Sequence, residues 1–158
     1  MSAQFDRPWD KTVAGSLERA IAIAVSAHTG QTDKVGAPYI LHPLRVMFRC
    51  HTETERIAAV LHDVVEDGPN WTFDRLRDEG FGDDVVNALD GLTKRPEEKH
   101  DYMTFVRRAA GDATAKAVKL ADIEDNLDVT RLPEITDEDQ ARISKYLAAR
   151  TFLLNGGT

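Results

Sequence analysis

The fold of this chain is decided by the stretch Ala58-Ala59-Val60-Leu61-His62-Asp63-Val64-Val65-Glu66-Asp67-Gly68. An apolar run with helical spacing leads into an adjacent His–Asp pair, and two further carboxylates follow within the next turn. On an α-helix, Glu66 lies one turn beyond His62, and Asp67 lies one turn beyond Asp63. Burying such groups without partners costs several kcal/mol, and a divalent metal ion is the simplest compensating partner. The stretch therefore predicts a helix that ends in a metal site.

Helical spacing of apolar residues extends over almost the whole sequence, whereas the alternation typical of strands is hard to find. We expect helices at 16–29, 42–51, 53–66, 72–79, 83–92, 101–110, 113–127 and 137–153. Glycine and proline indicate a loop at 30–38, and the charged segment 93–99 is predicted to be an exposed loop. The sequence thus predicts an all-α fold, a single-domain helical bundle over residues 1–158 whose motif-bearing core spans about 16–131.

Composition limits the classes of protein to which the chain can belong. Its 158 residues suit one domain, and 42% hydrophobic with 30% charged residues are typical of a soluble protein. No apolar run is long enough to cross a bilayer, no signal-peptide pattern is present, and Cys50 is the only cysteine, so we expect a cytoplasmic protein. The net charge of −7 argues against broad binding to nucleic acid or membranes, but it allows a small anionic substrate near a metal.

Ionisable residues interrupt the apolar helical surfaces at three places. His28 ends the apolar face of the first long helix, His62 and Asp63 end the central one, and Asp122 lies within an apolar segment near 118–123. Each alone is more simply explained as a hydrogen-bonded core residue or a cap. Together, two imidazoles and two carboxylates form a mixed set that suits Mn²⁺ or Fe²⁺, and the lack of cysteine ligands argues against structural zinc.

Three stretches also resemble a known family. They are Ala27-His28-…-Gly30-Gln31-…-Lys34-…-Gly36-Ala37-Pro38-Tyr39-Ile40-Leu41-His42-Pro43, then residues 59–67, then Lys119-Leu120-Ala121-Asp122-…-Asn126-Leu127. In this order they are similar to the motifs of HD-domain hydrolases of the RelA/SpoT type. The chain is too short for the further domains of the long bifunctional enzymes, so it resembles the stand-alone members, the small alarmone hydrolases and the metazoan SpoT homologue.

The resemblance implies a fold, a reaction and a set of site residues. The implied reaction removes pyrophosphate from the 3′ position of guanosine tetra- or pentaphosphate, with one Mn²⁺ as the usual cofactor. The implied metal ligands are His28, His62, Asp63 and Asp122. Glu66 and Asp67 would lie beside the reactive water, and the nucleotide pocket would be lined by Lys34, Tyr39, His42 and Asn126.

General chemistry is compatible with this reaction. A bound divalent ion lowers the pKa of a water molecule towards neutrality, and Glu66 and Asp67 are suited to orient that water and relay a proton. The alternative for both carboxylates is a solvated helix end. Asn126 lies one turn beyond Asp122, where it binds ribose or phosphate, caps the helix or holds Asp122. Arg131 follows closely and is a further candidate for a phosphate contact.

Two departures from the family pattern concern the substrate. Asp33 stands where an arginine is expected, and Ile123 stands where a basic residue is expected, followed by the acidic Glu124 and Asp125. Both changes are expected to weaken the attraction for a highly phosphorylated ligand, and they put guanine selectivity in doubt. The segment Thr93-Lys94-Arg95 and Lys116 either replace some of the lost charge or are solvated surface residues.

Several functions therefore stay open. The leading hypothesis is a metal-dependent hydrolase of a (p)ppGpp-like nucleotide. The alternatives are hydrolysis of an adenosine alarmone or a nucleoside 5′-phosphate, an antitoxin role with the same chemistry, and a non-catalytic nucleotide-sensing module. Oligomeric state is left open, and Trp9 and Trp71 are interpreted as packing anchors.

Overall fold

Helices make up the regular structure of residues 13–157, the part of the chain that the computed structural model describes. They are α1 (Leu17–His28), α2 (Leu41–Phe48), α3 (Glu53–Leu61), α4 (Val64–Asp67), α5 (Phe73–Asp78), α6 (Asp83–Leu92), α7 (Tyr102–Ala110), α8 (Ala113–Asn126) and α9 (Asp137–Leu154), with 3₁₀ turns η2 (Pro96–Glu98) and η3 (Val129–Arg131). Within these residues there is no strand, only an isolated bridge between Thr32 and Pro38. The predicted all-α fold is confirmed, and Trp9 lies outside the described residues.

Most of these helices begin at a polar side chain that accepts a hydrogen bond from the backbone three residues on. The capping residues are Ser16, Thr52, Thr72, Asp101, Asp112 and Thr136. Each satisfies a backbone N–H that has no partner inside its helix, so helix starts are encoded locally. The predicted cap at Thr72 is among them.

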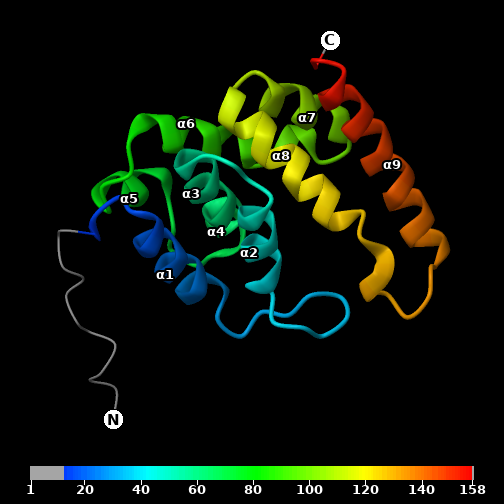
Figure 1. Ribbon diagram of the computed structural model, residues 1–158, viewed down its shortest axis with the longest axis horizontal. Coiled ribbons are helices and arrows are strands. Elements are labelled where there is room, and N and C mark those ends of the chain that lie inside the picture. The colour runs from blue at the N-terminus through cyan, green and yellow to red at the C-terminus, as the bar shows by residue number, and fades with distance from the viewer. Residues whose placement is uncertain (1–12, 158) are drawn as a thin grey trace.

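The main core is built around α3. Its residues 58–61 have no exposed surface, and the helix packs against α1, α2, α6 and α8. Figure 1 shows α3 in the interior of this group, with α1 and α2 beside it. Small residues such as Ala20, Ala24 and Ala58 lie in this core and allow close approach of the helices. The predicted packing role of Trp71 is consistent with its 9% exposure in the same core.

A second, smaller core joins the C-terminal helix to the rest. It contains Val106 of α7, Ile123 of α8, and Ala149 and Leu153 of α9. In Figure 1, α9 runs along the side of α7 and α8. Ile123 has no exposed surface and packs in this second core with residues of α9. The expectation that an isoleucine at this position weakens the attraction for an anionic ligand stays a prediction.

The predicted helix over 53–66 is interrupted. Helix α3 ends at Leu61, and α4 begins only at Val64. At the junction, Nδ1 of His62 donates a 2.6 Å hydrogen bond to the carbonyl of Ala59, and the backbone N–H of His62 bonds to the same carbonyl. A side chain that takes a backbone acceptor competes with the regular ladder of the helix. His62 and Asp63 therefore lie at a bend rather than along one helix face.

The segment 93–99 also differs from the prediction of an exposed loop. It contains η2, and Glu98 at the end of that turn is only 3% exposed. Arg108 of α7 donates to both carboxylate oxygens of Glu98, with Nε to Oε1 at 2.7 Å and Nη2 to Oε2 at 2.9 Å. A buried ion pair thus fastens this segment to α7.

No helix in the described residues is long and apolar enough to cross a membrane.

Candidate metal centre

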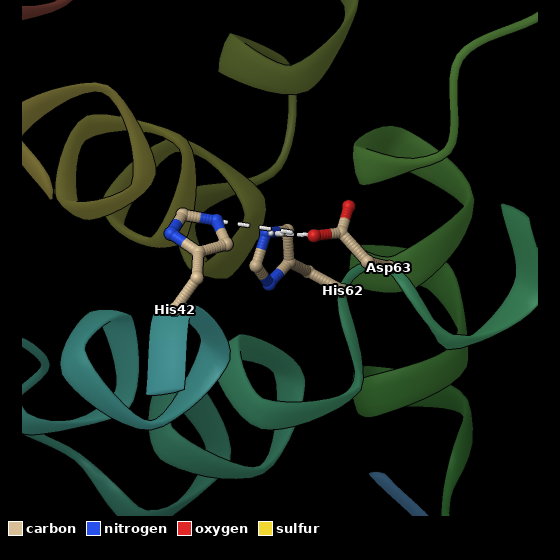
Figure 2. Close-up of side chains that lie close together, drawn as sticks. All are labelled: His42, His62 and Asp63. Carbon is tan, nitrogen blue, oxygen red and sulfur yellow. Dashed lines mark ion pairs between the residues drawn. The ribbon is translucent and has the colours of Figure 1, made fainter. Parts of the chain in front are cut away.

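Four side chains from three parts of the chain converge on one point. His42 comes from α2, His62 and Asp63 from the bend between α3 and α4, and Asp122 from α8. Nε2 of His62 lies 3.0 Å from Oδ2 of Asp63 and 3.7 Å from Oδ1 of Asp122. Nε2 of His42 lies 3.2 Å from Oδ1 of Asp122 and 3.9 Å from Oδ2 of Asp63. We call these four residues the His/Asp cluster; Figure 2 shows both rings directed towards Asp63.

The outer nitrogens of both rings are engaged elsewhere. Nδ1 of His62 donates to the carbonyl of Ala59, and Nδ1 of His42 donates to Oδ2 of Asp125 at 2.8 Å. The Ala59 carbonyl and the Asp125 carboxylate can only accept a hydrogen bond, so each Nδ1 carries a proton. The Nε2 atom of each ring is therefore the nitrogen directed into the cluster. Nε2 of His62 is buried and makes no hydrogen bond within the described residues. A hydrogen bond from the far nitrogen with a free Nε2 is the arrangement typical of metal-binding histidines.

The two carboxylates of the cluster are also held in place. The hydroxyl of Tyr39 donates a 2.5 Å hydrogen bond to Oδ2 of Asp63. Nζ of Lys119 donates to Oδ2 of Asp122 at 2.9 Å, and Nδ2 of Asn126 donates to Oδ1 of Asp122 at 2.9 Å. Fixed carboxylates with His nitrogens opposite them fit a divalent cation of mixed N/O preference.

Protonation of the metal-free cluster follows from its charges. Burial opposes protonation of His62, but the carboxylate of Asp63, 3.0 Å away, and that of Asp122, 3.7 Å away, hold its pKa well above the usual range. Burial likewise opposes protonation of His42, and hydrogen bonds with Asp122 and Asp125 raise its pKa. Although burial disfavours ionisation of Asp63, His62 holds the pKa of that carboxyl to about 2. The carboxylates of Asp63 and Asp122 thus stabilise positive charge beside them, which protons on the two histidines or a bound cation would supply.

A cavity of about 450 Å³ opens beside the cluster. Asp63 and Asp122 line it, together with all of the residues that the sequence places at the nucleotide: Lys34, Tyr39, His42, Asn126 and Arg131. Its wall also includes Arg45 of α2 and, from α9, Arg142 and Tyr146. The cavity therefore combines carboxylates and imidazoles at one end with several cations and aromatic rings along its sides.

A family sequence model described as "HD domain" matches residues 20–147. The chain belongs to the HD-domain family. The adjacent pair His62 and Asp63 at the bend lies within the matched residues.

Relatives of this HD domain are named as pyrophosphohydrolases or pyrophosphokinases of guanosine nucleotides. It is 32% identical over 142 residues to a guanosine-3′,5′-bis(diphosphate) 3′-pyrophosphohydrolase of Aquifex aeolicus, covering 84% of this chain and 20% of the relative. It is 36% identical over 132 residues to the protein of the same name from Spiroplasma citri, covering 75% and 17%. It is 33% identical over 137 residues to a probable GTP pyrophosphokinase of Mycobacterium leprae, covering 80% and 17%. The chain spans about a fifth of the length of these curated relatives.

The cluster of this HD domain differs in one member from the ligand set expected from the sequence. His42, expected in the nucleotide pocket, directs Nε2 to the carboxylates, whereas His28 contacts other residues. Nδ1 of His28 lies 2.9 Å from Oε1 of Gln31, and its ring centroid lies 5.0 Å from that of Tyr39. Tyr39 in turn contacts the ring of His42, with centroids 5.8 Å apart. We therefore assign the fourth ligand position to His42 in the proposal below.

Glu66 and Asp67 end α4 and are not among the residues that line the cavity. Oε1 of Glu66 accepts a hydrogen bond from the backbone N–H of Lys94, so the segment after α6 is fastened to α4. Partial burial and the charge of Asp63 raise the pKa of Asp67. Partial burial also raises the pKa of Glu66, although the bond from Lys94 opposes this shift. Both carboxyls thus hold a proton more readily than free side chains do.

The segment Thr93-Lys94-Arg95 contributes no cation to the cavity wall. Nζ of Lys94 lies 5.9 Å from the centre of the Phe105 ring, and Arg95 pairs with Asp90 at 3.4 Å. Asp33 does line the cavity, and its Oδ1 accepts the backbone N–H groups of Val35 and Ala37. The acid at position 33 therefore closes the loop before α2.

Two important residues of the HD domain escaped the sequence analysis. Asp125 was interpreted as added negative charge, yet it has no exposed surface and its carboxylate is bound by His42 and Arg45. Lys119 belongs to the third sequence motif, and it is buried between Asp122 and the ring of Phe105, whose centroid lies 4.5 Å from Nζ. The spacing of Lys119 and Asp122, one helical turn apart, was the available signal.

Proposed function

We propose that this HD domain is a divalent-metal-dependent phosphohydrolase that removes the 3′-pyrophosphate of a (p)ppGpp-like nucleotide. The observation that carries the proposal is the convergence of Nε2 of His42 and His62 with carboxylate oxygens of Asp63 and Asp122 at one end of a cation-lined cavity. The names of the relatives supply the substrate class.

The proposed metal ligands are His42, His62, Asp63 and Asp122, and Mn²⁺ is the proposed ion. When bound there, such an ion lowers the pKa of a water molecule and withdraws charge from a phosphoryl oxygen. The protein's own contribution is to keep the ligands in position without rearrangement. Lys119 and Asn126 hold Asp122, and Tyr39 holds Asp63, so the protein's own side chains orient both carboxylates.

Glu66 and Asp67 are proposed to hold and move protons. Asp67 retains a proton to higher pH than an exposed aspartate, because partial burial and the nearby Asp63 raise its pKa. Such a carboxyl suits donation to a leaving phosphate oxygen. Glu66 has one oxygen engaged by Lys94, which fixes its orientation and leaves the other oxygen for water.

Lys34, Asn126 and Arg131 are proposed to bind the phosphates and ribose, since all three line the cavity. Tyr39 and Tyr146 also line the cavity, and their rings are proposed to contact the base. The partner is thus a small phosphorylated nucleotide rather than nucleic acid, and the proposed compartment is the cytoplasm, in keeping with the single, unpaired Cys50.

A second candidate is the same chemistry on another nucleotide, such as an adenosine alarmone or a nucleoside 5′-phosphate. Asp33 favours it, because an acid at the cavity wall reduces the attraction for a heavily phosphorylated ligand. A sensing module without catalysis is the third candidate, and it would require the cluster to bind metal and nucleotide without turnover.

The test is hydrolysis of a nucleotide panel by purified protein with added Mn²⁺. The panel contains ppGpp, pppGpp, ppApp and ordinary nucleoside mono- and triphosphates, with Asp63→Asn as the inactive control. Glu124→Gln is the matched control, because Glu124 lies on the same helix as Asp122 but pairs with Arg150 at 2.9 Å. Pyrophosphate release from the guanosine alarmones supports the proposal. Turnover of other nucleotides alone moves the specificity to the second candidate, and tight binding without turnover favours the sensing module.

A further inference from the structure

Arg45 is a cavity residue that the proposed function does not yet use. It lies one turn beyond His42 on α2, so both side chains leave the same face of the helix. Its Nε donates to Oδ1 of Asp125 at 2.8 Å and its Nη2 donates to Oδ2 at 3.1 Å. This two-point contact fixes the plane of the guanidinium group.

The carboxylate that holds Arg45 is the one that holds a cluster histidine. Oδ2 of Asp125 accepts Nδ1–H of His42, and the whole residue has no exposed surface. Arg131 joins the same carboxylate from η3, with Nη2 3.6 Å from Oδ2 and a 3.0 Å hydrogen bond to the Asp125 carbonyl. One buried charge therefore orients a histidine of the cluster and two cavity-lining guanidinium groups.

Two further cations of the cavity are arranged differently. Lys34 comes from the loop before α2 and Arg142 from α9, and both pair with Asp139. Among residues 13–157, neither shares a hydrogen-bond or ion-pair partner with the His/Asp cluster. Arg45 is tied to the cluster through Asp125, and its Nη1 makes no hydrogen bond to any residue between 13 and 157.

We propose that Arg45 is a specificity-determining phosphate-binding residue, which receives the phosphate next to the His/Asp cluster. Position 33 is an aspartate and supplies no positive charge to the cavity, whereas Arg45 of α2 does. The inference rests on the proposed function, since it concerns the same cavity. A guanidinium fixed by two hydrogen bonds loses little conformational freedom when it binds an anion, and its remaining N–H groups match phosphate oxygens.

The test compares Arg45→Gln, Arg45→Lys and the control Arg49→Gln. Arg49 caps the end of α2, one helical turn beyond Arg45, but its side chain is exposed and does not line the cavity. Binding of Mn²⁺ alone is followed by the loss of its free electron paramagnetic resonance signal. KM and kcat are then measured with Mn²⁺ and the nucleotide that the wild-type protein hydrolyses.

We expect Arg45→Gln to raise KM about tenfold or more, while its affinity for Mn²⁺ stays within about twofold of wild type. Arg45→Lys should recover part of the loss, and Arg49→Gln should behave as wild type. An unchanged KM overturns the inference. A fall in Mn²⁺ affinity and kcat with KM unchanged also overturns it, because Arg45 would then act only by holding Asp125.

The failure of this inference is distinguishable from failure of the proposed function. If the wild-type protein hydrolyses no nucleotide, the hydrolase proposal fails, and calorimetric titration of ppGpp into the Mn²⁺-loaded protein then tests Arg45. Weaker binding to Arg45→Gln than to Arg49→Gln supports the inference in that case. Equal affinities of the two variants, or no binding by wild type, overturn it.

Discussion

Nδ1 of His42 donates a 2.8 Å hydrogen bond to Oδ2 of Asp125, a residue with no exposed surface. The bond crosses from α2 to α8 and fixes which nitrogen of His42 faces the cluster. Burial opposes ionisation of Asp125, but His42 and Arg45 hold the pKa of its carboxyl to about 2, so it is charged at neutral pH. Its role in the metal centre can be tested without any substrate.

Asp125→Asn should weaken Mn²⁺ binding by about 10- to 100-fold, the usual effect of losing the acceptor behind a metal-binding histidine. The amide keeps the size of the side chain but lacks the charge that orients the imidazole. Mn²⁺ titration followed by electron paramagnetic resonance measures the change, with Glu124→Gln as the neighbouring control on α8. Wild-type affinity in Asp125→Asn, with the fold verified by circular dichroism, would contradict this assignment.

His42→Gln and His28→Gln separate two candidate ligand sets. We expect His42→Gln to abolish stoichiometric Mn²⁺ binding, because Nε2 of His42 lies 3.2 Å from Asp122 in the cluster. His28→Gln should retain binding, because the ring of His28 contacts Gln31 and Tyr39 instead. Equilibrium dialysis with metal analysis gives the stoichiometry. Loss of the metal in the His28 variant only would restore the set expected from the sequence.

Lys119→Met should destabilise the metal-free protein by about 3–5 kcal/mol, because it leaves the buried Asp122 without its main counter-charge. Saturating Mn²⁺ should recover part of this loss, since a cation at the cluster replaces the missing charge and binds the folded state. Urea unfolding with and without Mn²⁺ provides both numbers. Lys116→Met, one turn earlier on α8, should change the free energy of unfolding little, with or without Mn²⁺. Equal losses of stability in the Lys116 and Lys119 variants would contradict the role of Lys119 as the counter-charge of Asp122.

Acid stability should depend on the ion pair between Glu98 and Arg108. Hydrogen bonds from Arg108 hold the pKa of Glu98 to about 2, against 4.5 for the free side chain. Because the folded-state pKa is the lower one, the contribution of the pair is complete above pH 4.5 and is lost as the pH falls towards 2. We expect Glu98→Gln to cost about 1–2 kcal/mol at neutral pH and to converge with wild type near pH 2. Thermal unfolding of both proteins between pH 2 and pH 7 measures the difference in stability. A difference that stays the same at every pH would refute the prediction.

Much of the fold could be predicted because its signals are local. Helix starts are encoded by single side chains such as Thr72 and Thr136, and apolar spacing identifies the buried faces. The break after Leu61 could not be predicted in this way, because it depends on a side chain that bonds back to the Ala59 carbonyl. Similarly, Glu98 is charged and lies in a segment with Pro96, and only its pairing with Arg108 explains its burial.

The candidate site was harder to predict for a physical reason. His62, Asp63 and Asp122 each follow apolar residues with helical spacing, and the structure does bring these three together. His28 and His42 are both buried histidines at helix ends, so spacing alone does not distinguish them. The distinction lies in Asp125, a partner 83 residues away in sequence from His42. The assignment of His42, His62, Asp63 and Asp122 as metal ligands stays a prediction.

The bend between α3 and α4 makes the metal centre a reporter of tertiary folding. On one continuous helix, the side chains of His62 and Asp63 would leave the axis about 100° apart; at the bend, their ligand atoms lie 3.0 Å from each other. A peptide of residues 53–67 contains only these two ligands of the four, and the others arrive from α2 and α8. If the proposed site binds a metal ion, tight binding would therefore show that three separate segments of the chain have assembled correctly, and a misfolded or truncated chain would bind the ion weakly.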